Sequence, residues 1–408
     1  MNHKTGMPEL RFTGFDSQWE SKKVGELCDS IVPGRNKPTN FEGDIPWITT
    51  PDIEHNGIIN HSKKGLNISR EEAKKVGSKI VPINSIIISC VGELGLSAIA
   101  GKEIIINQQL HAFIPKERIE YRFLLYQLNL KQKYMDKVAT KTAVPYMNKD
   151  NCNSIPIDFP TLPEQQKIAS FLSSVDEKIQ QLSRKKELLE QYKKGVMQQL
   201  FSGKLRFKDE NGNNYVDWDE KKLGDVINNI GGTALEKHVN SEGKYKFISI
   251  GNYSVNGHYI DNKQRISLNE KTKVKLLNKN DLVMVLNDKT TSGDLIGSSI
   301  LIDVDDTFIY NQRSERLICK QNIFPLFLWF YLNSFTFRKE LFAISQGGTQ
   351  IYVNFPSVKK LQIQIPSIEE QQKIANFLSS IDSKIKSANQ QITQTQSFRK
   401  GLLQQLFV

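Results

Sequence analysis

A short stretch of the chain carries residue types that could bind phosphate. The sequence GLSAIAGKE (95–103) resembles a phosphate-binding loop. Such a loop needs four residues between its glycines, followed by Lys and by a hydroxyl residue that binds magnesium. Here five residues separate Gly95 from Gly101, and Glu103 stands at the hydroxyl position. The spacing therefore argues against a nucleotide-phosphate site at this loop.

A second pattern imitates a metal-dependent nuclease. Asp52 follows Pro51, and Glu72 begins Glu-Ala-Lys, which together mimic a PD…ExK motif. The chemistry requires both carboxylates on one hard cation. Glu72 lies in a predicted helical turn, and GNY (251–253), which corresponds to the first acid in the second half, has none. We interpret the pattern as chance, and His55 and His61 as loop residues that are not spaced for one metal.

Other catalytic signatures are absent from the sequence. The chain has no Pro-Pro, so it lacks the Asn/Asp-Pro-Pro-Tyr motif that positions an exocyclic amine in amino-methyltransferases. It has no GxGxxG nucleotide loop either. The sequence therefore offers no catalytic signature, no set of ligands spaced for a metal and no nucleotide-binding loop.

Composition points to a soluble protein with a polyanionic partner. The 408 residues carry a formal charge of +11, which favours a polyanion, nucleic acid before an anionic membrane. On charge alone, a soluble basic protein without such a partner fits equally well. The most apolar run (323–332) is half the length of a membrane span and predicts a buried helix. With no apolar leader and no CxxC pair, we expect a reduced, cytoplasmic location. The scattered cysteines are Cys28, Cys90, Cys152 and Cys319.

An internal repeat organises the whole chain. EQQKIASFLSSVDEKI (164–179) returns as EQQKIANFLSSIDSKI (370–385), and KKGVMQQLF (193–201) returns as RKGLLQQLF (399–407). Weaker matches precede each copy in the same order. The chain is therefore a duplicated unit, in which a variable region precedes a segment that repeats closely. We divide it into 1–161, 162–207, 208–366 and 367–408.

The closely repeated segments read as two long helices. Apolar residues follow 4-3-4-3 spacing, the pattern of a heptad seam. Two such seams predict an antiparallel coiled coil, although each helix could instead pack on its own variable region. KLRF (204–207) follows the first helix, and ELRF (9–12) is expected to dock against the end of the second. The apolar seam residues are Ile168, Leu172, Val175, Ile179, Leu182, Leu189, Val196, Ile374, Leu378, Ile381, Ile385, Ile392, Leu402 and Leu406.

The variable regions are predicted to be mixed α/β, which makes the fold α+β overall. Apolar runs at 84–89 and 280–285 predict buried strands, whereas 122–138 and 324–341 have helical spacing. Matching loops rich in Gly, Lys, Arg and Tyr could reach phosphates and base edges, or could simply be solvated connections. These loops are 32–41, 139–149, 231–240 and 344–354.

The repeated phrases resemble the specificity (S) subunits of type I restriction–modification enzymes. LPEQQKIA (162–169) and QQLFSGKLRF (198–207) look like the central region of that family, and MPELRFTGFDSQWESKKVGEL (7–27) looks like its usual start. PWITTPDI (46–53) is close to the family's recognition-domain pattern, while KFISIGNY (246–253) departs from it. The resemblance covers essentially the full length.

The resemblance implies a non-catalytic subunit with two target-recognition domains in a pseudo-two-fold arrangement. Each domain would read half of a bipartite double-stranded DNA site. The helices would set the gap between the halves and dock two modification (methyltransferase) subunits, and two restriction subunits would join for cleavage. S-adenosylmethionine would belong to the modification subunits, and ATP and magnesium to the restriction subunits.

Positions carried over from the family give a set of candidate DNA contacts. Gln and Asn can read adenine, Arg can read guanine, and Lys can grip phosphate. The alternatives are a stand-alone DNA nuclease or methyltransferase, and a coiled-coil scaffold without DNA binding. The candidates are Arg35, Lys37, Thr49, Thr50, Gln108, Lys141, Thr142, Tyr146, Asn148, Lys237, Asn252, Lys289, Gln312, Arg313, Gln346, Thr349 and Tyr352.

Overall fold

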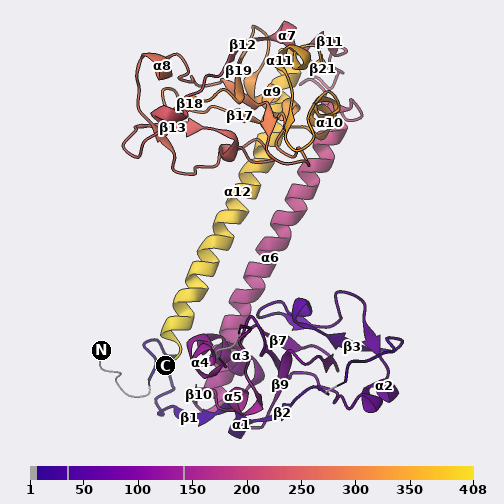
Figure 1. Cartoon of the computed structure of the whole chain (residues 1–408), viewed down its shortest axis with the longest axis vertical. Helices are drawn as coiled ribbons and strands as arrows, with labels where there is room; N and C mark the ends of the chain where they lie inside the picture. The colour runs from indigo at the N-terminus through magenta and orange to yellow at the C-terminus, as the bar shows by residue number, and fades with distance from the viewer. Residues whose placement is uncertain (1–6, 35, 141–142) are drawn as a thin grey trace. The chain divides into compact units, whose positions relative to one another are not determined.

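The chain divides into two compact units, each with one variable region and parts of both long helices (Figure 1). The computed structural model describes residues 7–34, 36–140 and 143–408. Unit 1 comprises Met1–Ser183 and Gln390–Val408, and unit 2 comprises Arg184–Asn389. Each unit therefore takes the first half of one long helix and the last part of the other.

Unit 1 builds its variable region on a mixed five-stranded sheet of order β2-β9-β6-β7-β4, beside a three-stranded sheet of order β5-β3-β8. Strand β1 pairs with β10 in an antiparallel ribbon. The strands are β1 (Glu20–Lys23), β2 (Cys28–Ile31), β3 (Ile45–Ile48), β4 (Ile58–Ile59), β5 (Asn67–Ile68), β6 (Ile86–Ser89), β7 (Ser97–Ala100), β8 (Ile105–Ile106), β9 (Leu110–Pro115) and β10 (Pro156–Phe159).

Helices cover the core of unit 1. The expected helix at 122–138 is two helices, because the backbone leaves the helical conformation at Lys131. The Lys131 ammonium also pairs with Asp158 at 2.8 Å. The helices are α1 (Val24–Leu27), α2 (Arg70–Lys75), α3 (Tyr121–Leu130), α4 (Gln132–Val138) and α5 (Lys149–Asn153), with a 3-10 turn, η1 (Thr50–Asp52).

Unit 2 repeats the core topology. Its four-stranded sheet has the order β12-β19-β15-β17, and a second sheet has the order β14-β13-β18. In both units the middle strand of the three-stranded sheet pairs in parallel with a later strand. The strands are β11 (Asp219–Lys222), β12 (Ile227–Gly231), β13 (Tyr245–Ile248), β14 (Arg265–Ile266), β15 (Leu282–Val285), β16 (Asn287–Asp288), β17 (Ser299–Leu301), β18 (Phe308–Tyr310), β19 (Ser314–Cys319), β20 (Ile351–Tyr352) and β21 (Gln362–Ile365).

The second predicted helix, at 324–341, is also divided. Ser334 caps a new helix by accepting a hydrogen bond from the Phe337 amide at 3.3 Å. The apolar run becomes a buried helix, as expected from its length. The helices are α7 (Leu223–Val226), α8 (Glu270–Lys273), α9 (Pro325–Leu332), α10 (Phe335–Ala343) and α11 (Phe355–Val358), with 3-10 turns η2 (Glu236–His238) and η3 (Ile250–Asn252).

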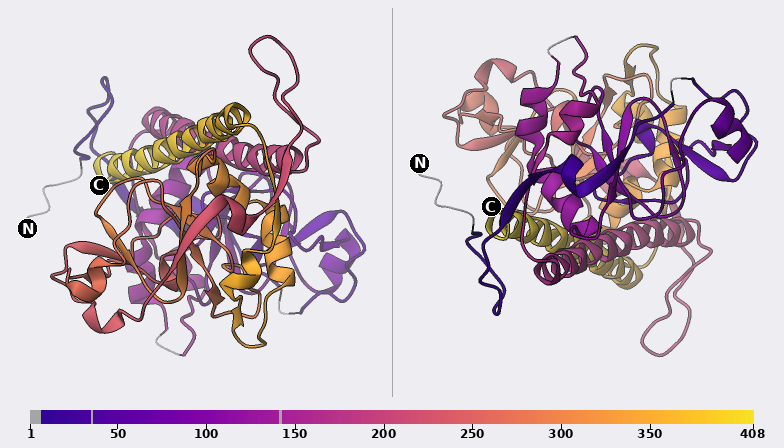
Figure 2. Two further views of the ribbon diagram at one scale, coloured as in Figure 1. Left: turned by 90° about the horizontal axis from the view of Figure 1, so that it is seen from above. Right: turned by 90° about the horizontal axis from the view of Figure 1, so that it is seen from below.

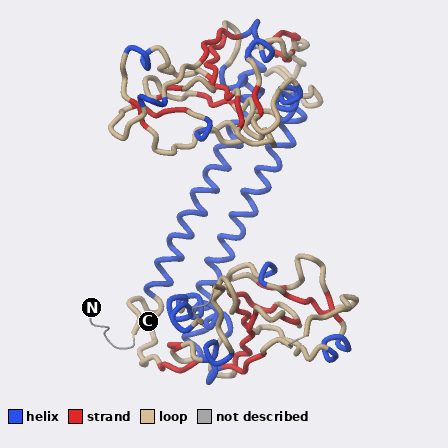
Figure 3. Tube along the Cα trace, viewed as in Figure 1, coloured by secondary structure: helices blue, strands red, loops and turns tan. Residues whose placement is uncertain are grey.

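Two long helices, α6 (Leu162–Phe201) and α12 (Ile368–Gln405), confirm the predicted helical segments. Within each unit, the start of one helix lies beside the end of the other, running in opposite directions (Figures 1 and 3). Ile168 and Leu406 share one core with the variable region of unit 1, and Leu200 and Ile374 share the core of unit 2. The seam therefore contacts both the other helix and the variable region.

The predicted seam residues are all at least half-buried, which matches the heptad pattern. In the described part of the chain, no helix has an apolar stretch long enough to cross a membrane.

Candidate nucleic-acid interface and the joints beneath it

The carboxylates that imitate a nuclease motif hold loops in place. Asp52 accepts hydrogen bonds from the Thr49 amide at 2.7 Å and from the Lys63 amide at 2.6 Å. Burial alone would raise the pKa of Asp52, but the hydrogen bonds outweigh it and lower the pKa. Glu72 accepts separately from the Thr39 amide at 2.8 Å. Among the described residues, no group of His, Cys, Asp or Glu could hold a metal ion.

Several predicted contact loops of unit 1 meet at the end of β6. The Cys90 amide donates to the Gln109 carbonyl at 2.8 Å, and the Met147 amide donates to the Cys90 carbonyl at 2.9 Å. This joins the 107–109 loop to the 139–149 loop. The Thr50 hydroxyl donates to the Gln109 side chain at 3.1 Å, which brings η1 to the same place.

The candidates of unit 1 differ in how free their side chains are. Lys37, Gln108 and Tyr146 are exposed, and the Gln108 side chain donates to the Gly34 carbonyl at 3.3 Å. Asn148 caps α5 by accepting from the Asn151 amide at 2.8 Å, so its carbonyl oxygen is engaged in the fold. The Thr49 hydroxyl donates to Asp52 in the same way at 2.7 Å. Three candidates lie outside the described residues: Arg35, Lys141 and Thr142.

Unit 2 gathers its loops at the end of β15. The Leu286 amide donates to the Arg313 carbonyl, and the Val353 amide donates to the Leu286 carbonyl, both at 2.9 Å. The Asn311 amide group donates to Glu236 at 3.0 Å, which ties in the 231–240 loop. The loops that join the strands extend from the sheets in both units (Figure 3).

The predicted contacts of unit 2 are accessible with one exception. The Tyr352 hydroxyl donates to Gln346 at 3.1 Å on the surface. Asn252, however, is fully buried, accepting from the Ser249 amide at 3.0 Å and donating to the Ile260 carbonyl at 2.8 Å. We leave Asn252 out of the DNA contacts, because a buried amide with satisfied atoms cannot reach a groove. The accessible ones are Lys237, Lys289, Gln312, Arg313, Gln346, Thr349 and Tyr352.

The repeated EQQ phrase forms a joint between helix and variable region. In unit 1, Arg11 donates to both oxygens of Glu164 at 2.7 Å, and this glutamate is fully buried. In unit 2, Arg206 donates to Glu370 at 3.2 and 2.9 Å. The hydrogen bond with its glutamate raises the pKa of each arginine, so both joints remain charged.

The glutamine that follows each glutamate closes the joint. Gln165 accepts from the Glu120 amide at 2.9 Å and donates to the Arg118 and Pro160 carbonyls at 3.0 and 2.9 Å. Gln371 accepts from the Phe324 amide at 2.8 Å. It also donates to the Asn322 and Pro366 carbonyls at 3.0 and 2.9 Å. Sequence reasoning missed this role, although the identity of the two phrases was the available signal.

The N-terminal ELRF segment docks as expected. The Leu10 amide donates to the Gln405 carbonyl at 2.9 Å, beside the end of α12 (Figure 2). In unit 2 the Leu205 amide donates to the Gln199 carbonyl at 3.1 Å. In each unit, a segment with the sequence LRF therefore docks beside the C-terminal end of a long helix. In unit 2 this segment follows α6 directly, whereas in unit 1 it comes from the N-terminal region and docks on α12.

An ion pair links α6 to α12 within each unit. Arg399 pairs with Asp176 in unit 1, and Lys193 pairs with Asp382 at 2.6 Å in unit 2. These four residues correspond through the 206-residue offset of the repeat. The ion pairs therefore mark equivalent positions in the two units.

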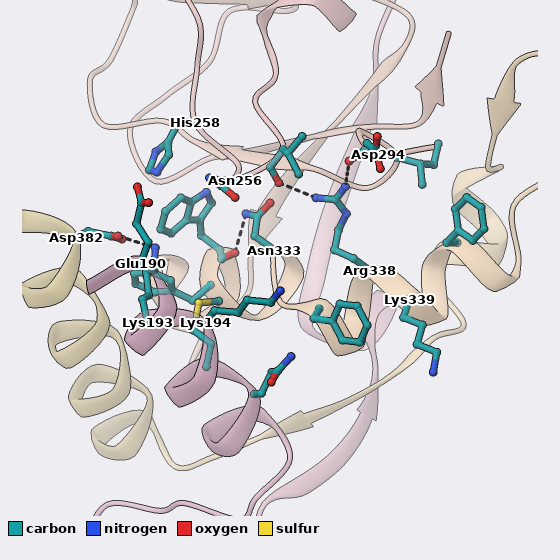
Figure 4. A pocket seen from close by; sticks show the side chains of 18 of the residues that line it. Glu190, Lys193, Lys194, Asn256, His258, Asp294, Asn333, Arg338, Lys339 and Asp382 are labelled. Carbon is teal, nitrogen blue, oxygen red and sulfur yellow. Dashed lines mark hydrogen bonds and ion pairs between the residues drawn. The ribbon is translucent and has the colours of Figure 1, made fainter. Parts of the chain in front are cut away.

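Unit 2 also has a cavity of about 860 Å³ between α6, α10 and the loops of its variable region (Figure 4). The rings of His258 and Trp329 pack at 5.3 Å, and the Lys193 ammonium lies 5.1 Å from the centre of the Phe330 ring. Burial lowers the pKa of His258, with Asp382 opposing and Lys193 adding to the effect. The predicted DNA contacts do not line this cavity.

Comparisons with known proteins agree with this architecture. The family model described as "Type I restriction modification DNA specificity domain" matches residues 16–191 and again 215–396. The MjaVIII specificity subunit of Methanocaldococcus jannaschii is 28% identical, with 94% of this chain and 91% of the relative covered. The MjaIX specificity subunit of the same organism is 24% identical over 99% and 96%.

Solved structures share the fold. A type I S subunit from M. genitalium aligns with a TM-score of 0.62 at 18% identity, over 98% of this chain and 99% of that one. A chain from a study of type I R-M complex assembly aligns with a TM-score of 0.56 at 16% identity, over 96% and 97%. With two copies of the specificity domain on a shared core topology, this chain belongs to the type I restriction–modification specificity-subunit family.

Proposed function

We propose that the chain is the non-catalytic DNA-specificity subunit of a type I restriction–modification complex, and that each variable region reads one half of a bipartite site. The observation that carries this proposal is the gathering of polar loops at the end of β6 in unit 1 and of β15 in unit 2. Rigid strands present these loops, a common arrangement for recognition residues.

The direct contacts are assigned to the side chains that remain accessible. Gln108 and Gln312 occupy the same loop in the two regions and suit adenine, whereas Arg313 suits guanine. Lys37, Lys237 and Lys289 suit phosphate, whose contacts position the protein without reading sequence. Thr50, Tyr146, Gln346, Thr349 and Tyr352 complete the proposed set, and Arg35, Lys141 and Thr142 remain proposals from the sequence.

We further propose that α6 and α12 form a coiled coil that sets the gap between the half-sites. At ~1.5 Å per residue, the 40 and 38 residues of these helices give lengths of about 60 and 57 Å. Adding one heptad to each helix extends the pair by ~10 Å, about three base pairs. The methylated motif should then gain a longer spacer with unchanged half-sites, and an unchanged spacer would remove the ruler function.

The complex is proposed to contain two modification and two restriction subunits. S-adenosylmethionine, ATP and magnesium would be bound by those subunits, and this chain would bind none of them. The close repeat of α6 in α12 supports two equivalent docking positions.

Expression of the chain with its modification subunit, followed by sequencing of methylated adenines, tests the proposal. We expect one asymmetric bipartite motif, and the purified chain alone should neither cut nor methylate DNA. Cutting or methylation by the chain alone would favour a stand-alone enzyme. A complex with no DNA-sequence preference would favour a scaffold.

A further inference from the structure

Each long helix exposes an aromatic side chain near its C-terminal end. Tyr192 on α6 is 53% exposed, and Phe398 on α12 is 55% exposed. The two residues are 206 positions apart, so they are counterparts in the repeat. A large aromatic side chain in water at both equivalent positions has no role in the cores of the units.

A glycine follows each aromatic residue one turn later on the same face. Gly195 and Gly401 lie inside α6 and α12, where glycine is a poor helix former. Outside its own stretch of helix, a Cβ at either position would meet no described atom within 4 Å, and neither glycine has a positive φ. Packing and backbone conformation within the chain therefore give no reason for glycine at either site.

The two copies of the repeat become similar again at Tyr192 and Phe398, after a stretch in which their sequences differ. Residues 184–191 and 390–397 have no identity at any position. From Tyr192 and Phe398 onward the copies match again, including at the exposed residues Lys194 and Lys400. Two copies within one chain keep the same exposed residues when both face the same kind of partner.

The helix surface beside each ring adds to the description of that partner. An apolar ring beside an open stretch of helix backbone fits a partner helix with small residues at the crossing. Small residues at a helix crossing let two backbones approach closely.

We propose that each aromatic-x-x-Gly element, Tyr192/Gly195 and Phe398/Gly401, is the anchor at which one helix of a modification subunit packs on this chain. The inference rests on the proposed function and adds the residues that hold the partner. Unit 2 carries one anchor and unit 1 the other, so two identical subunits bind one chain. The cavity of unit 2 is lined by Glu190, Lys194 and Gln198, whose spacing places them on a different face of α6 from Tyr192.

Substitution of the glycines separates assembly from folding. In Gly195→Leu or Gly401→Leu the new side chain projects into open space, so the free chain should keep or raise its Tm. Each single variant should bind one modification subunit instead of two, and the double variant should bind none. Native mass spectrometry of co-expressed subunits measures this directly. Gln396→Leu is the matched control, because it adds Leu at an exposed position on another face of α12 and should leave two subunits bound.

A second pair of variants covers the case in which a leucine lowers the Tm of the free chain. Phe398→Ala should weaken binding of one subunit at least tenfold, and Phe398→Tyr should restore it, since Tyr192 serves the other anchor. Two subunits bound to the double glycine variant would overturn the anchors and leave the proposed function intact. A wild-type chain that binds no modification subunit would overturn the anchors and the proposed assembly together.

Discussion

The two units use the same joint to hold different recognition surfaces. Glu164 and Glu370 each fix an arginine, and Gln165 and Gln371 make three corresponding hydrogen bonds at nearly the same distances. The surface loops, in contrast, share little sequence. The repeated phrase therefore preserves the attachment of each variable region, which leaves the loops free to diverge.

The two units differ at a few equivalent positions, although they share the same core topology. The Trp218 indole donates to Glu370 at 2.9 Å, whereas the buried Trp19 indole nitrogen has no hydrogen-bond partner among the described residues. Asp52 of unit 1 is matched by Asn252 in unit 2, and each accepts a hydrogen bond from the amide three residues earlier. Chemically different residues can thus fill one position when the acceptor is kept.

The largest expected effect comes from breaking the joints. Glu370→Ala leaves the Arg206 guanidinium partly buried without its carboxylate, which should cost unit 2 about 3–5 kcal/mol. Glu164→Ala should have a similar effect on unit 1. The Glu370 variant should lose ~1 kcal/mol more, because the Trp218 indole also loses its acceptor. Hydrogen exchange resolved by unit measures both losses. Equal effects would show that the Trp218 bond contributes nothing.

The next prediction is that a change in pH affects the stability of the two units in opposite directions. His111 of β9 lies opposite β6, and Glu315 of β19 lies opposite β15, at equivalent positions of the two sheets. Burial lowers the pKa of His111 to about 4, so the unfolded chain takes up the proton first as the pH falls. Unit 1 should then lose ~3 kcal/mol between about pH 6.5 and 4, at ~1.4 kcal/mol per pKa unit.

Unit 2 should respond in the opposite direction. Burial raises the pKa of Glu315, against the hydrogen bond from Asn229, so the folded unit binds the proton more readily. The stabilisation that Glu315 gives to unit 2 is fully present below the ordinary pKa of a glutamate. It is lost as the pH rises through the raised pKa of the folded state. Hydrogen exchange across this range checks both signs, with His111→Phe and Glu315→Gln as controls. A common direction in both units would contradict the assignment.

Substitution of Gln165 or of Gln371 should lower the free energy of unfolding of its own unit by the same amount. Gln165→Ala and Gln371→Ala each leave one amide and two carbonyls without partners, at about 2 kcal/mol. Because the two sets of bonds match, the losses should agree within ~0.5 kcal/mol. Gln166→Ala and Gln372→Ala are exposed neighbours that serve as controls. A large inequality would mean that the joints are not equivalent.

The smallest effect concerns the ion pairs between the helices. Lys193 and Asp382 are partly exposed, so their coupling should be below ~1 kcal/mol in a double-mutant cycle. The Arg399–Asp176 pair should couple somewhat more strongly, because the guanidinium contacts both oxygens. Lys193→Arg should bring unit 2 to the value of unit 1, and no change would contradict this explanation.

The sequence was sufficient to predict the elements whose patterns are periodic. Heptad spacing predicted α6 and α12, and apolar runs predicted β6 and β15. The breaks at Lys131 and Ser334 were missed, because hydrophobic periodicity does not record a non-helical backbone conformation at one residue or the capping of a new helix.

The candidate contacts were predictable by loop but not by residue. Asn252 resembles a surface amide in sequence, and only the fold shows that its side chain is buried. The role of Glu164 was hidden because its partner, Arg11, lies 153 positions away. The repeat itself indicated that both copies had a shared task.

Exchange of the second variable region is the most direct test of the central claim, that the two units read DNA independently. Residues 210–365 are replaced by those of another family member, the joint residues Arg206 and Glu370 are kept, and methylated adenines are sequenced. We predict that one half of the bipartite motif changes while the other half and the spacer persist. A change in both halves, or in neither, would contradict the account.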